Sequence, residues 1–266
     1  MTRILVEGDY HCGNLLGLTP PDCWSLKLEA MQRVMWDFRE AELKAIGPVD
    51  VHVMNGDLVD GPGRKDSMGH LTTDLDEQAL MAIECAERVK AKHRVVTYGS
   101  PYHVNLNNNI ERAIAQHFGI EIHDTARFKV AGKKFNFRHV IGRSDVPGGP
   151  GAQTEKEITN DLLRSTFMGH EPADVYGRQH VHYFYMVNNG SQVAFSGPAW
   201  ELDIDAPGNI YPRTLRTLRY RIGFTVIDVD TTGEVFVRPR MLKVNDHFPK
   251  EYQEWPDLNP SLQLAK

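Results

Sequence analysis

The stretch Ile4-Leu5-Val6-Glu7-Gly8-Asp9-Tyr10-His11 opens with a short apolar run and closes on polar residues. Such a run is typical of a buried strand, and Gly8-Asp9 predicts that the strand ends in a loop. A carboxylate and an imidazole two residues apart in this loop can face one metal ion. A turn aspartate beside a surface histidine is the simpler interpretation, because a D-x-H triplet often arises by chance. Residues farther along the chain decide between the two.

Strand-like and helix-like segments alternate through the first half of the chain. Apolar residues at helical spacing are followed by Gly47-Pro48, which predicts a helix that ends there. Short apolar runs close on Asn55-Gly56-Asp57 and on Gly99. The expected order after the first strand is helix 25–46, strand 49–54, helix 74–92, strand 94–98 and helix 108–118. Strands that alternate with helices indicate parallel β-α-β units.

Hairpin-like pairs dominate the second half of the chain. Ala131-Gly132, Asn188-Asn189-Gly190 and Thr232-Gly233 each lie between two strand-like runs. No internal repeat and no clear linker interrupts the chain, so we expect one domain over residues 1–245 and a C-terminal tail over residues 246–266. The expected elements are strands 126–130 and 133–140, helix 155–167, strand 174–176, strands 183–187 and 192–195, and strands 224–229 and 235–240.

Composition argues against several classes of protein. The chain has 266 residues, with 30 Lys and Arg against 35 Asp and Glu, and its charge of −5 argues against a surface that coats nucleic acid or an anionic membrane. Cys12, Cys23 and Cys85 lack C-x-x-C spacing, so we expect neither a disulfide framework nor a cysteine zinc site. Without a signal-peptide core or an 18-residue apolar stretch, we expect a cytoplasmic protein with no membrane partner. Twelve histidines make imidazole and carboxylate the expected metal ligands.

Three further polar groups follow strand-like runs. Gly56-Asp57-Leu58-Val59-Asp60 closes the second strand, and a turn rich in Gly and Asp is the alternative interpretation. Gly177-Arg178-Gln179-His180-Val181-His182 follows the strand at 174–176, and in a loop its two imidazoles can face two neighbouring ions. His139 ends another strand-like run. Because open α/β sheets place ligand sites at the carboxyl ends of their strands, this succession predicts one shared site.

The order of these motifs resembles the calcineurin-like metallophosphoesterase superfamily, from residue 4 to about residue 240. The resemblance implies an α/β fold, a four-layer α/β/β/α sandwich of two mixed β-sheets flanked by helices. It also implies a dinuclear metal site between the sheets, with Asp57 bridging the ions and Asp60 orienting a neighbouring ligand. The remaining ligands that the resemblance implies are Asp9, His11 and His182 for one ion, and His139 and His180 for the other.

The loop Gly99-Ser100-Pro101-Tyr102-His103 departs from the family's G-N-H motif. The usual Asn ligand is missing and His103 lies two residues late, so His103 is expected either as a general acid or as a metal ligand in the vacated position. Arg178-Gln179 replaces the family's glycine before the first histidine of H-x-H.

The other seven histidines, His70 among them, are expected to be structural or exposed. The asparagines after the loop either supply an amide oxygen or start a helix; they are Asn105, Asn107, Asn108 and Asn109.

Three residues are candidates for contact with a substrate. Tyr102 can line the groove, with core packing as its default role. Arg178 lies at the approach to the H-x-H motif. Arg213 belongs to the densest basic stretch of the chain, which suits an extended anionic substrate, although a solvated strand or helix face is the simpler interpretation.

Carboxylates and imidazoles without thiolate suit two divalent transition metals, Mn first, with Fe, Zn or Ni as alternatives. Two ions about 3.5–4 Å apart lower the pKa of a shared water and stabilise in-line displacement at phosphorus. We therefore expect hydrolysis of a phosphate ester, with His103 protonating the leaving oxygen if it binds no metal. The expected substrate is a phosphorylated small molecule, a nucleotide or a nucleic acid. The alternatives are a nuclease with the same site and a non-catalytic binding scaffold that keeps the fold.

Overall fold

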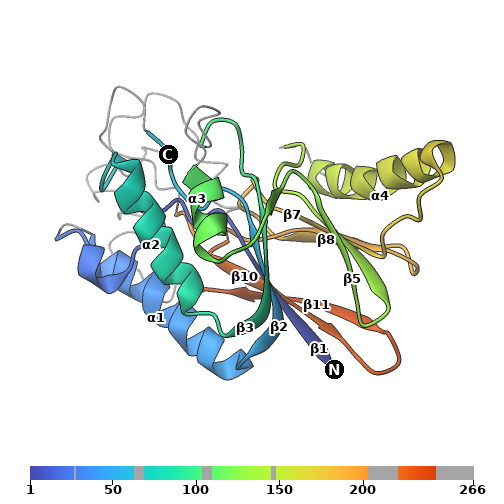
Figure 1. Ribbon diagram of the computed structural model, residues 1–266, viewed down its shortest axis with the longest axis horizontal. Helices are drawn as coiled ribbons and strands as arrows, with labels where there is room; N and C mark the ends of the chain where they lie inside the picture. Colours follow the sequence, from blue (N-terminus) through green and yellow to red (C-terminus); the bar gives the residue numbers. More distant parts are fainter. Residues whose placement is uncertain (27, 63–68, 104–109, 145–147, 203–220, 244–266) are drawn as a thin grey trace, which may run out of the picture.

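Two mixed β-sheets pack face to face, and helices cover their outer faces (Figure 1). The computed structural model describes residues 1–26, 28–62, 69–103, 110–144, 148–202 and 221–243. The arrangement confirms the predicted α/β fold with two mixed sheets flanked by helices. In the described part of the chain, no helix combines the length and the apolar character needed to span a membrane. The expected domain boundary at residue 245 lies outside the described residues and stays a prediction.

The first sheet contains the predicted β-α-β units. Strands β1, β2, β3 and β4 run parallel in this order, and β10 and then β11 extend the sheet antiparallel on the other side of β1. The carboxyl ends of β1, β2 and β3 therefore lie at one edge. The strands are β1 (Thr2–Glu7), β2 (Val49–Asn55), β3 (Ala91–Thr97), β4 (Ile122–His123), β10 (Gly223–Val229) and β11 (Val235–Met241).

The second sheet has the strand order β5-β6-β7-β9-β8. Strands β6, β7 and β9 are parallel, while β5 and β8 pair antiparallel at the two edges. The loops after β6 and β7 therefore leave the sheet side by side. The strands are β5 (Ala126–Val130), β6 (Lys133–Phe137), β7 (Val175–Arg178), β8 (Tyr185–Asn188) and β9 (Val193–Ser196).

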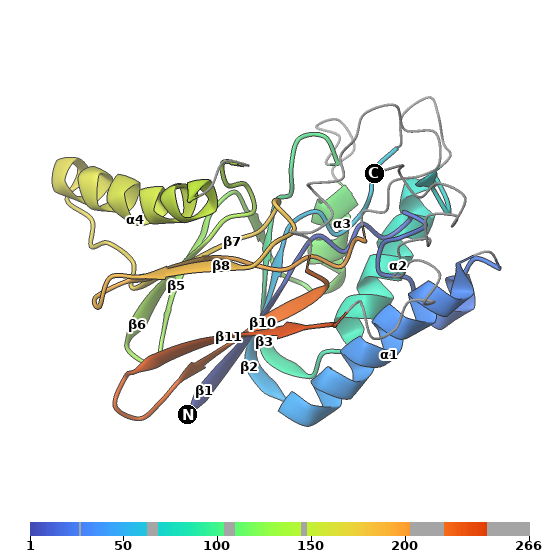
Figure 2. The same cartoon turned by 180° about the vertical axis from the view of Figure 1, so that it is seen from behind.

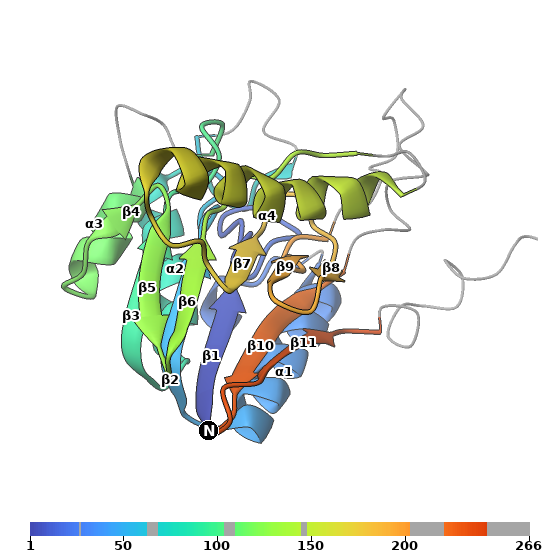
Figure 3. The same cartoon turned by 90° about the vertical axis from the view of Figure 1, so that its right-hand side faces the viewer.

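The helices form the two outer layers. Figures 1 and 2 show α1, α2 and α3 beside the first sheet and α4 on the opposite side of the molecule. Figure 3 shows α4 crossing over the strands of the second sheet. The four layers are thus helices, sheet, sheet and helix. The helices are α1 (Glu29–Ile46), α2 (Leu75–Glu87), α3 (Ile110–His117) and α4 (Gly149–Met168), with a short 3-10 turn at Pro21–Cys23.

Alternating side chains of β1 contribute to two hydrophobic cores. Leu5 belongs to the core shared with α1 and α2, while Ile4 and Val6 belong to the core between the two sheets. Phe137 of β6 lies in the same inter-sheet core. A smaller cluster that includes Ile158 packs α4 on the outer face of the second sheet. Because both faces of β1 are covered, its sequence Ile4-Leu5-Val6 is a continuous apolar run.

Element boundaries differ from the predictions for local reasons. Strand β3 begins at Ala91, three residues early, because Ala91 pairs with Val49 of β2. Helix α4 begins at Gly149 instead of residue 155, with a proline in its first turn, where a missing N–H costs no hydrogen bond. The strand expected to reach residue 140 ends at Phe137, so His139 lies in the following loop. Strand β4 has only two residues, too few for a sequence pattern.

A buried charged network joins the end of β1 to α1. Glu7 and Arg39 are fully buried, and Arg39 Nε and Nη2 donate to the Glu7 carboxylate at 3.0 and 2.9 Å. The Tyr10 hydroxyl and the Trp200 indole N–H donate to the same carboxylate at 2.8 and 3.2 Å. Burial opposes ionisation of Glu7, but Arg39 and His52 outweigh it and hold the pKa of Glu7 well below its ordinary value. The network fixes the loop after β1 and the segment after β9 against α1.

Replacing Arg39 with methionine leaves the Glu7 carboxylate buried without its main cationic partner. We expect the free energy of unfolding to fall by about 3–5 kcal/mol, measured by urea denaturation at pH 7. Arg33→Met is the control, because Arg33 pairs with Glu29 on an exposed face of α1. That pair should contribute less than about 1 kcal/mol. Equal losses in the two variants would contradict a structural role for the network.

Candidate metal centre

The candidate metal centre lies where strands of both sheets end. Parallel strands bring their carboxyl ends to one edge of a sheet, so the polar loops that follow them can meet. The donor atoms in each candidate group of side chains lie within 4.8 Å of one another. The structure brings together six of the residues implied as ligands: Asp9 and His11 after β1, Asp57 after β2, His139 after β6, and His180 and His182 after β7.

Hydrogen bonds of the main chain hold these loops together. The Asp9 N–H donates to Gly56 O and the His11 N–H donates to Asp57 O, at 2.9 and 3.1 Å, which joins the loops after β1 and β2. The His180 N–H donates to Asp9 Oδ2 at 3.0 Å, which joins the loop after β7 to the loop after β1. The backbones of both sheets therefore set the spacing of the centre.

Left-handed backbone conformation is concentrated in these loops. Six non-glycine residues of the described chain have a positive φ, and five of them belong to the centre. Such a conformation costs of order 1–3 kcal/mol for a residue with a Cβ, and it persists where the surroundings enforce it, often at functional sites. The concentration supports a functional role for the five. They are Asp9, His11, Asp57, His180 and His182, with φ between 46° and 77°.

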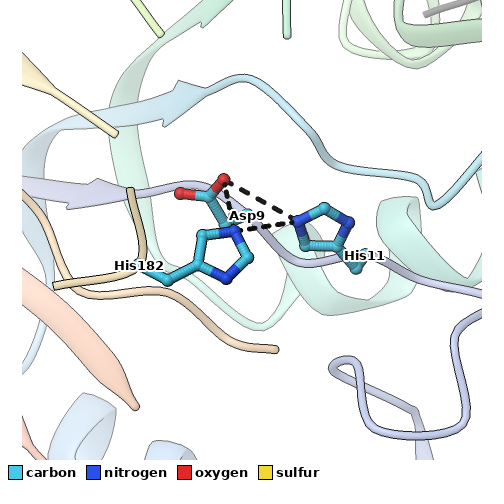
Figure 4. A group of neighbouring side chains, drawn as sticks. All are labelled: Asp9, His11 and His182. Atoms are coloured by element: carbon cyan, nitrogen blue, oxygen red, sulfur yellow. Dashed lines mark hydrogen bonds and ion pairs between the residues drawn. The ribbon is translucent and has the colours of Figure 1, made fainter. Parts of the chain in front are cut away.

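Asp9, His11 and His182 form the first group of donor atoms (Figure 4). His182 Nε2 lies 3.3 Å from Asp9 Oδ1 and 3.3 Å from His11 Nε2. His11 Nε2 lies 3.8 Å from the same Asp9 oxygen. One carboxylate oxygen and two imidazole nitrogens thus face a common point, which suits a single divalent ion.

Asp57, His139 and His180 form the second group. His139 Nε2 lies 2.8 Å and His180 Nδ1 lies 4.0 Å from Asp57 Oδ2. His139 Nδ1 lies 2.7 Å from Asn55 O, so the carbonyl accepts a hydrogen bond from Nδ1 and directs Nε2 toward Asp57. His139 Nε2 also lies 3.7 Å from Asp9 Oδ1, so the two groups are neighbours.

Two buried polar atoms of these two donor groups lack hydrogen-bond partners within the described residues. They are Asp9 Oδ1 and His139 Nε2. The His139 nitrogen is near Asp57 Oδ2, but the contact has the distance of a hydrogen bond without its geometry. An unpaired buried polar atom is costly unless an unseen group satisfies it. A metal ion satisfies an oxygen and a nitrogen lone pair of this kind.

The first group directs two imidazole nitrogens toward each other. His11 Nδ1 lies 3.2 Å from Asp60 Oδ1, and His182 Nδ1 lies 3.4 Å from Glu201 Oε2. Both carboxylates face Nδ1, as in histidines that bind metal through Nε2. The two Nε2 atoms then lie 3.3 Å apart, a contact that needs either a proton or a metal ion between them. The donor set therefore fits a metal ion.

The charge balance of the centre also suits cations. Burial opposes ionisation of Asp9, but His182 and His139 outweigh it, so the pKa of Asp9 lies well below its ordinary value. The same balance, with His139 as the main partner, lowers the pKa of Asp57. Burial opposes the charged form of His139, yet Asp57 and Asp9 raise its pKa to about 9. The carboxylates thus draw positive charge, which either protons or divalent ions can supply.

Asp60 contacts several neighbours of the centre. Its Oδ1 lies 3.2 Å from His11 Nδ1, and its Oδ2 lies 2.8 Å from His70 Nε2 and 3.4 Å from Asn14 Nδ2. The Asp60 carbonyl oxygen lies 2.7 Å from His103 Nδ1. These are the contacts of a residue that orients histidines, a role that stays a prediction. His70, expected to be structural or exposed, therefore lies beside the centre.

The loop after β3 brings three side chains to the centre. The Ser100 N–H donates to Asp57 Oδ1 at 2.6 Å, and Ser100 Oγ is buried without a hydrogen-bond partner in the described chain. His103 groups with His11 and Asp57, and its ring centroid lies 4.5 Å from that of His11. Burial and the nearby His11 lower the pKa of His103, which favours the neutral imidazole that binds metals. Tyr102 is 52% exposed, and its ring lies 4.7 Å from His103.

Glu111 of α3 lies behind Asp57 and is fully buried. Its Oε1 accepts the Leu58 N–H at 3.0 Å and its Oε2 accepts the Gly99 N–H at 2.7 Å. The carboxylate therefore joins the loops after β2 and β3. Burial first, and the Asp57 charge second, raise the pKa of Glu111 to about 7.

Arg178 is turned away from the centre, contrary to its expected place at a substrate. Its guanidinium is buried and donates to Glu157 of α4 at 2.8 Å and to Asn136 Oδ1 at 3.1 Å. Burial lowers the pKa of Arg178 to about 10 against the opposing charge of Glu157. The side chain is used in packing α4 on the second sheet. Arg213, Asn105, Asn107, Asn108 and Asn109 lie outside the described residues.

Glu201 belongs to the centre but was not among the sequence candidates. It groups with His11 and Asp60, and the backbone N–H of its neighbour Trp200 donates to Asp9 O at 2.9 Å. The strand-end rule that selects Asp9 also applies to the run at 192–195, and extending it past Gly197-Pro198 would have found this carboxylate. Glu111 and His70 carry no such signal, because each reaches the centre from a helix or a distant loop.

Comparisons with known proteins give likenesses of structure only. No family model and no curated protein matches the chain. Wild-type Vps29 from Entamoeba histolytica, complexed with zinc, is 11% identical, with 90% of this chain and 99% of that chain covered and a TM-score of 0.44. An archaeal phosphodiesterase is 12% identical, with 90% and 99% covered and a TM-score of 0.43. A predicted phosphoesterase from Streptococcus pneumoniae is 12% identical, with 91% and 98% covered and a TM-score of 0.37. At TM-scores below 0.5 these likenesses assign no activity to this chain.

Glu111 should make the stability of the metal-free protein depend on pH. Its folded pKa of about 7 lies above the ordinary value of 4.5, so its stabilising effect is complete below pH 4.5 and is lost as pH rises through 7. Glu111→Gln removes this titration. Urea unfolding of the chelator-treated proteins measures this effect. We expect the free energy of unfolding of wild type, relative to that of Glu111→Gln, to fall by about 2–3 kcal/mol between pH 5 and pH 8. A difference that is the same at both pH values would refute this assignment.

Proposed function

We propose that this centre binds two divalent transition-metal ions and hydrolyses phosphate esters. The observation that carries the proposal is the pair of neighbouring groups, each with one carboxylate and two imidazoles. In the first group the Nε2 atoms of His11 and His182 lie 3.3 Å apart. Asp57 also groups with His11 and His103, which supports a bridging position for its carboxylate.

The ligand chemistry supports borderline transition metals. Oxygen and nitrogen donors without thiolate suit Mn, Fe, Zn or Ni, and we propose Mn as the native ion. Cys12, Cys23 and Cys85 are free thiols, and none of them occurs in the candidate groups of the described chain. Free thiols also support the proposed cytoplasmic location, because disulfides are rare in a reducing compartment.

The proposed reaction depends on positioned side chains. When bound, the two ions lower the pKa of a water molecule and offset charge on the phosphoryl oxygens. Asp60 keeps His11 oriented through Nδ1, and the Ser100 N–H keeps the Asp57 carboxylate in place. The Asp60 carbonyl holds His103 through Nδ1, so Nε2 is the atom that either protonates the leaving oxygen or binds an ion.

One surface feature favours a nucleotide or a nucleic acid among the proposed substrates. Tyr102 exposes about half of its surface, and its ring contacts that of His103. An exposed aromatic ring can stack on any of the bases, so the contact does not depend on nucleic-acid sequence. A phosphorylated small molecule with an aromatic leaving group would use the same contact. A net charge of −5 makes a nucleic acid a local ligand of this face and not of the whole surface.

Asp57→Asn tests the proposal directly. The amide cannot supply the bridging charge, so we expect metal content to fall and cleavage of para-nitrophenyl phosphate and bis-para-nitrophenyl phosphate with added Mn to drop more than about 100-fold. Asp50→Asn is the matched control, because Asp50 lies at the opposite end of β2 and binds Lys92. The proposal fails if wild type binds no transition metal and cleaves neither ester. Two bound ions without cleavage of any phosphate ester would indicate a binding scaffold.

His103→Gln separates the two roles of His103. Loss of an ion from the variant identifies His103 as a ligand. Retention of both ions, with slower cleavage of esters whose leaving groups need a proton, identifies it as the general acid. Salt-dependent cleavage of labelled single- and double-stranded DNA then distinguishes a nuclease from an enzyme of small molecules.

A further inference from the structure

We propose that Glu201 is a positioning residue of the first metal ion, acting through His182. The inference rests on the proposed metal centre and adds a residue that the D-x-H, G-D-x-x-D and H-x-H motifs do not contain. Glu201 lies between β9 and β10, more than 18 residues beyond the last of these motifs. Its carboxylate nevertheless lies within reach of two of the predicted ligands.

The main chain around Glu201 is fixed against the first metal loop. The preceding residue, Trp200, is fully buried and donates its backbone N–H to Asp9 O at 2.9 Å. The following residue, Leu202, donates its N–H to Leu16 O at 3.0 Å. A side chain held on both sides in this way has little freedom to leave the centre.

The Glu201 carboxylate has two separate contacts. Its Oε1 accepts a hydrogen bond from Asn14 Nδ2 at 3.0 Å. Its Oε2 lies 3.4 Å from His182 Nδ1 and 3.7 Å from His11 Nε2. Asn14 also reaches Asp60 Oδ2 at 3.4 Å, so one amide links the two carboxylates. Glu201 is only 21% exposed, which limits competition from water for these contacts.

Glu201 and Asp60 have equivalent places around the first ion. Asp60 faces His11 Nδ1 at 3.2 Å, and Glu201 faces His182 Nδ1 at 3.4 Å. Each carboxylate favours the tautomer that carries hydrogen on Nδ1, which leaves the Nε2 lone pair for the ion. Without Glu201, His182 can place its proton on Nε2 and close the coordination position to a cation. The contact therefore selects the ligating form of His182.

Titration of chelator-treated protein with Zn²⁺ tests the role. We expect wild type to bind two ions. Glu201→Gln should lower the affinity for the first ion by about 10-fold and Glu201→Ala by up to about 100-fold, while the affinity for the second ion stays nearly unchanged. Glu87→Gln is the matched control, because Glu87 contacts His117 at 2.9 Å on the surface, away from the centre. Thermal unfolding of the metal-free variants checks that each one is folded.

Imidazole ¹⁵N spectra of the metal-free and zinc-loaded proteins report the tautomer of His182, which a merely structural role of Glu201 would leave unchanged. In wild type we expect a proton on His182 Nδ1, and in Glu201→Ala a shift of the metal-free His182 toward the Nε2–H tautomer. Two ions bound with wild-type affinity in Glu201→Ala, or an unchanged tautomer, would overturn the inference and leave the proposed function intact. Wild-type protein that binds no ion would overturn both.

Discussion

The approach of His11 Nε2 and His182 Nε2 to 3.3 Å is the constraint on which the account of this centre depends. Carboxylates face Nδ1 of both rings, so both Nε2 atoms are directed at each other and at Asp9 Oδ1. Without a metal ion, at least one of the two Nε2 atoms must carry a proton. The fold maintains this arrangement through backbone hydrogen bonds between the loops after β1 and β2, and through the His180 N–H, which donates to the Asp9 carboxylate.

The chain tolerates this arrangement because the loops that form it are held at the ends of strands in two β-sheets. Buried hydrophobic clusters lie on both faces of the first sheet, and the buried Glu7–Arg39 pair anchors the loop after β1. On such a support, five residues with a Cβ hold left-handed backbone conformations at one place. The rigid sheets thus position the strained loops, and the loops present the donor atoms.

Much of this organisation follows from sequence, because strand ends are visible as apolar runs that close on Asp or His. That rule selects Asp9, Asp57 and the H-x-H pair, whereas the two mixed sheets are implied only by the resemblance of the motif order to a known family. It fails where contacts come from elsewhere in the chain. The Glu111 carboxylate reaches the centre only through tertiary packing, and Glu201 lies beyond Gly197-Pro198, farther from its strand than the rule looks. Arg178 shows the opposite error: its place beside H-x-H says nothing of its direction, and its side chain packs against α4.

Anomalous diffraction from crystals grown with Mn²⁺ or Zn²⁺ is the most direct measurement of the central claim. We expect two peaks, one within bonding distance of Asp9 Oδ1 and the Nε2 atoms of His11 and His182, and a second beside Asp57 and His139. The two ions should lie about 3.5–4 Å apart. Crystals in which no peak lies at these atoms, at metal concentrations that saturate the protein in solution, would contradict a dinuclear metal centre.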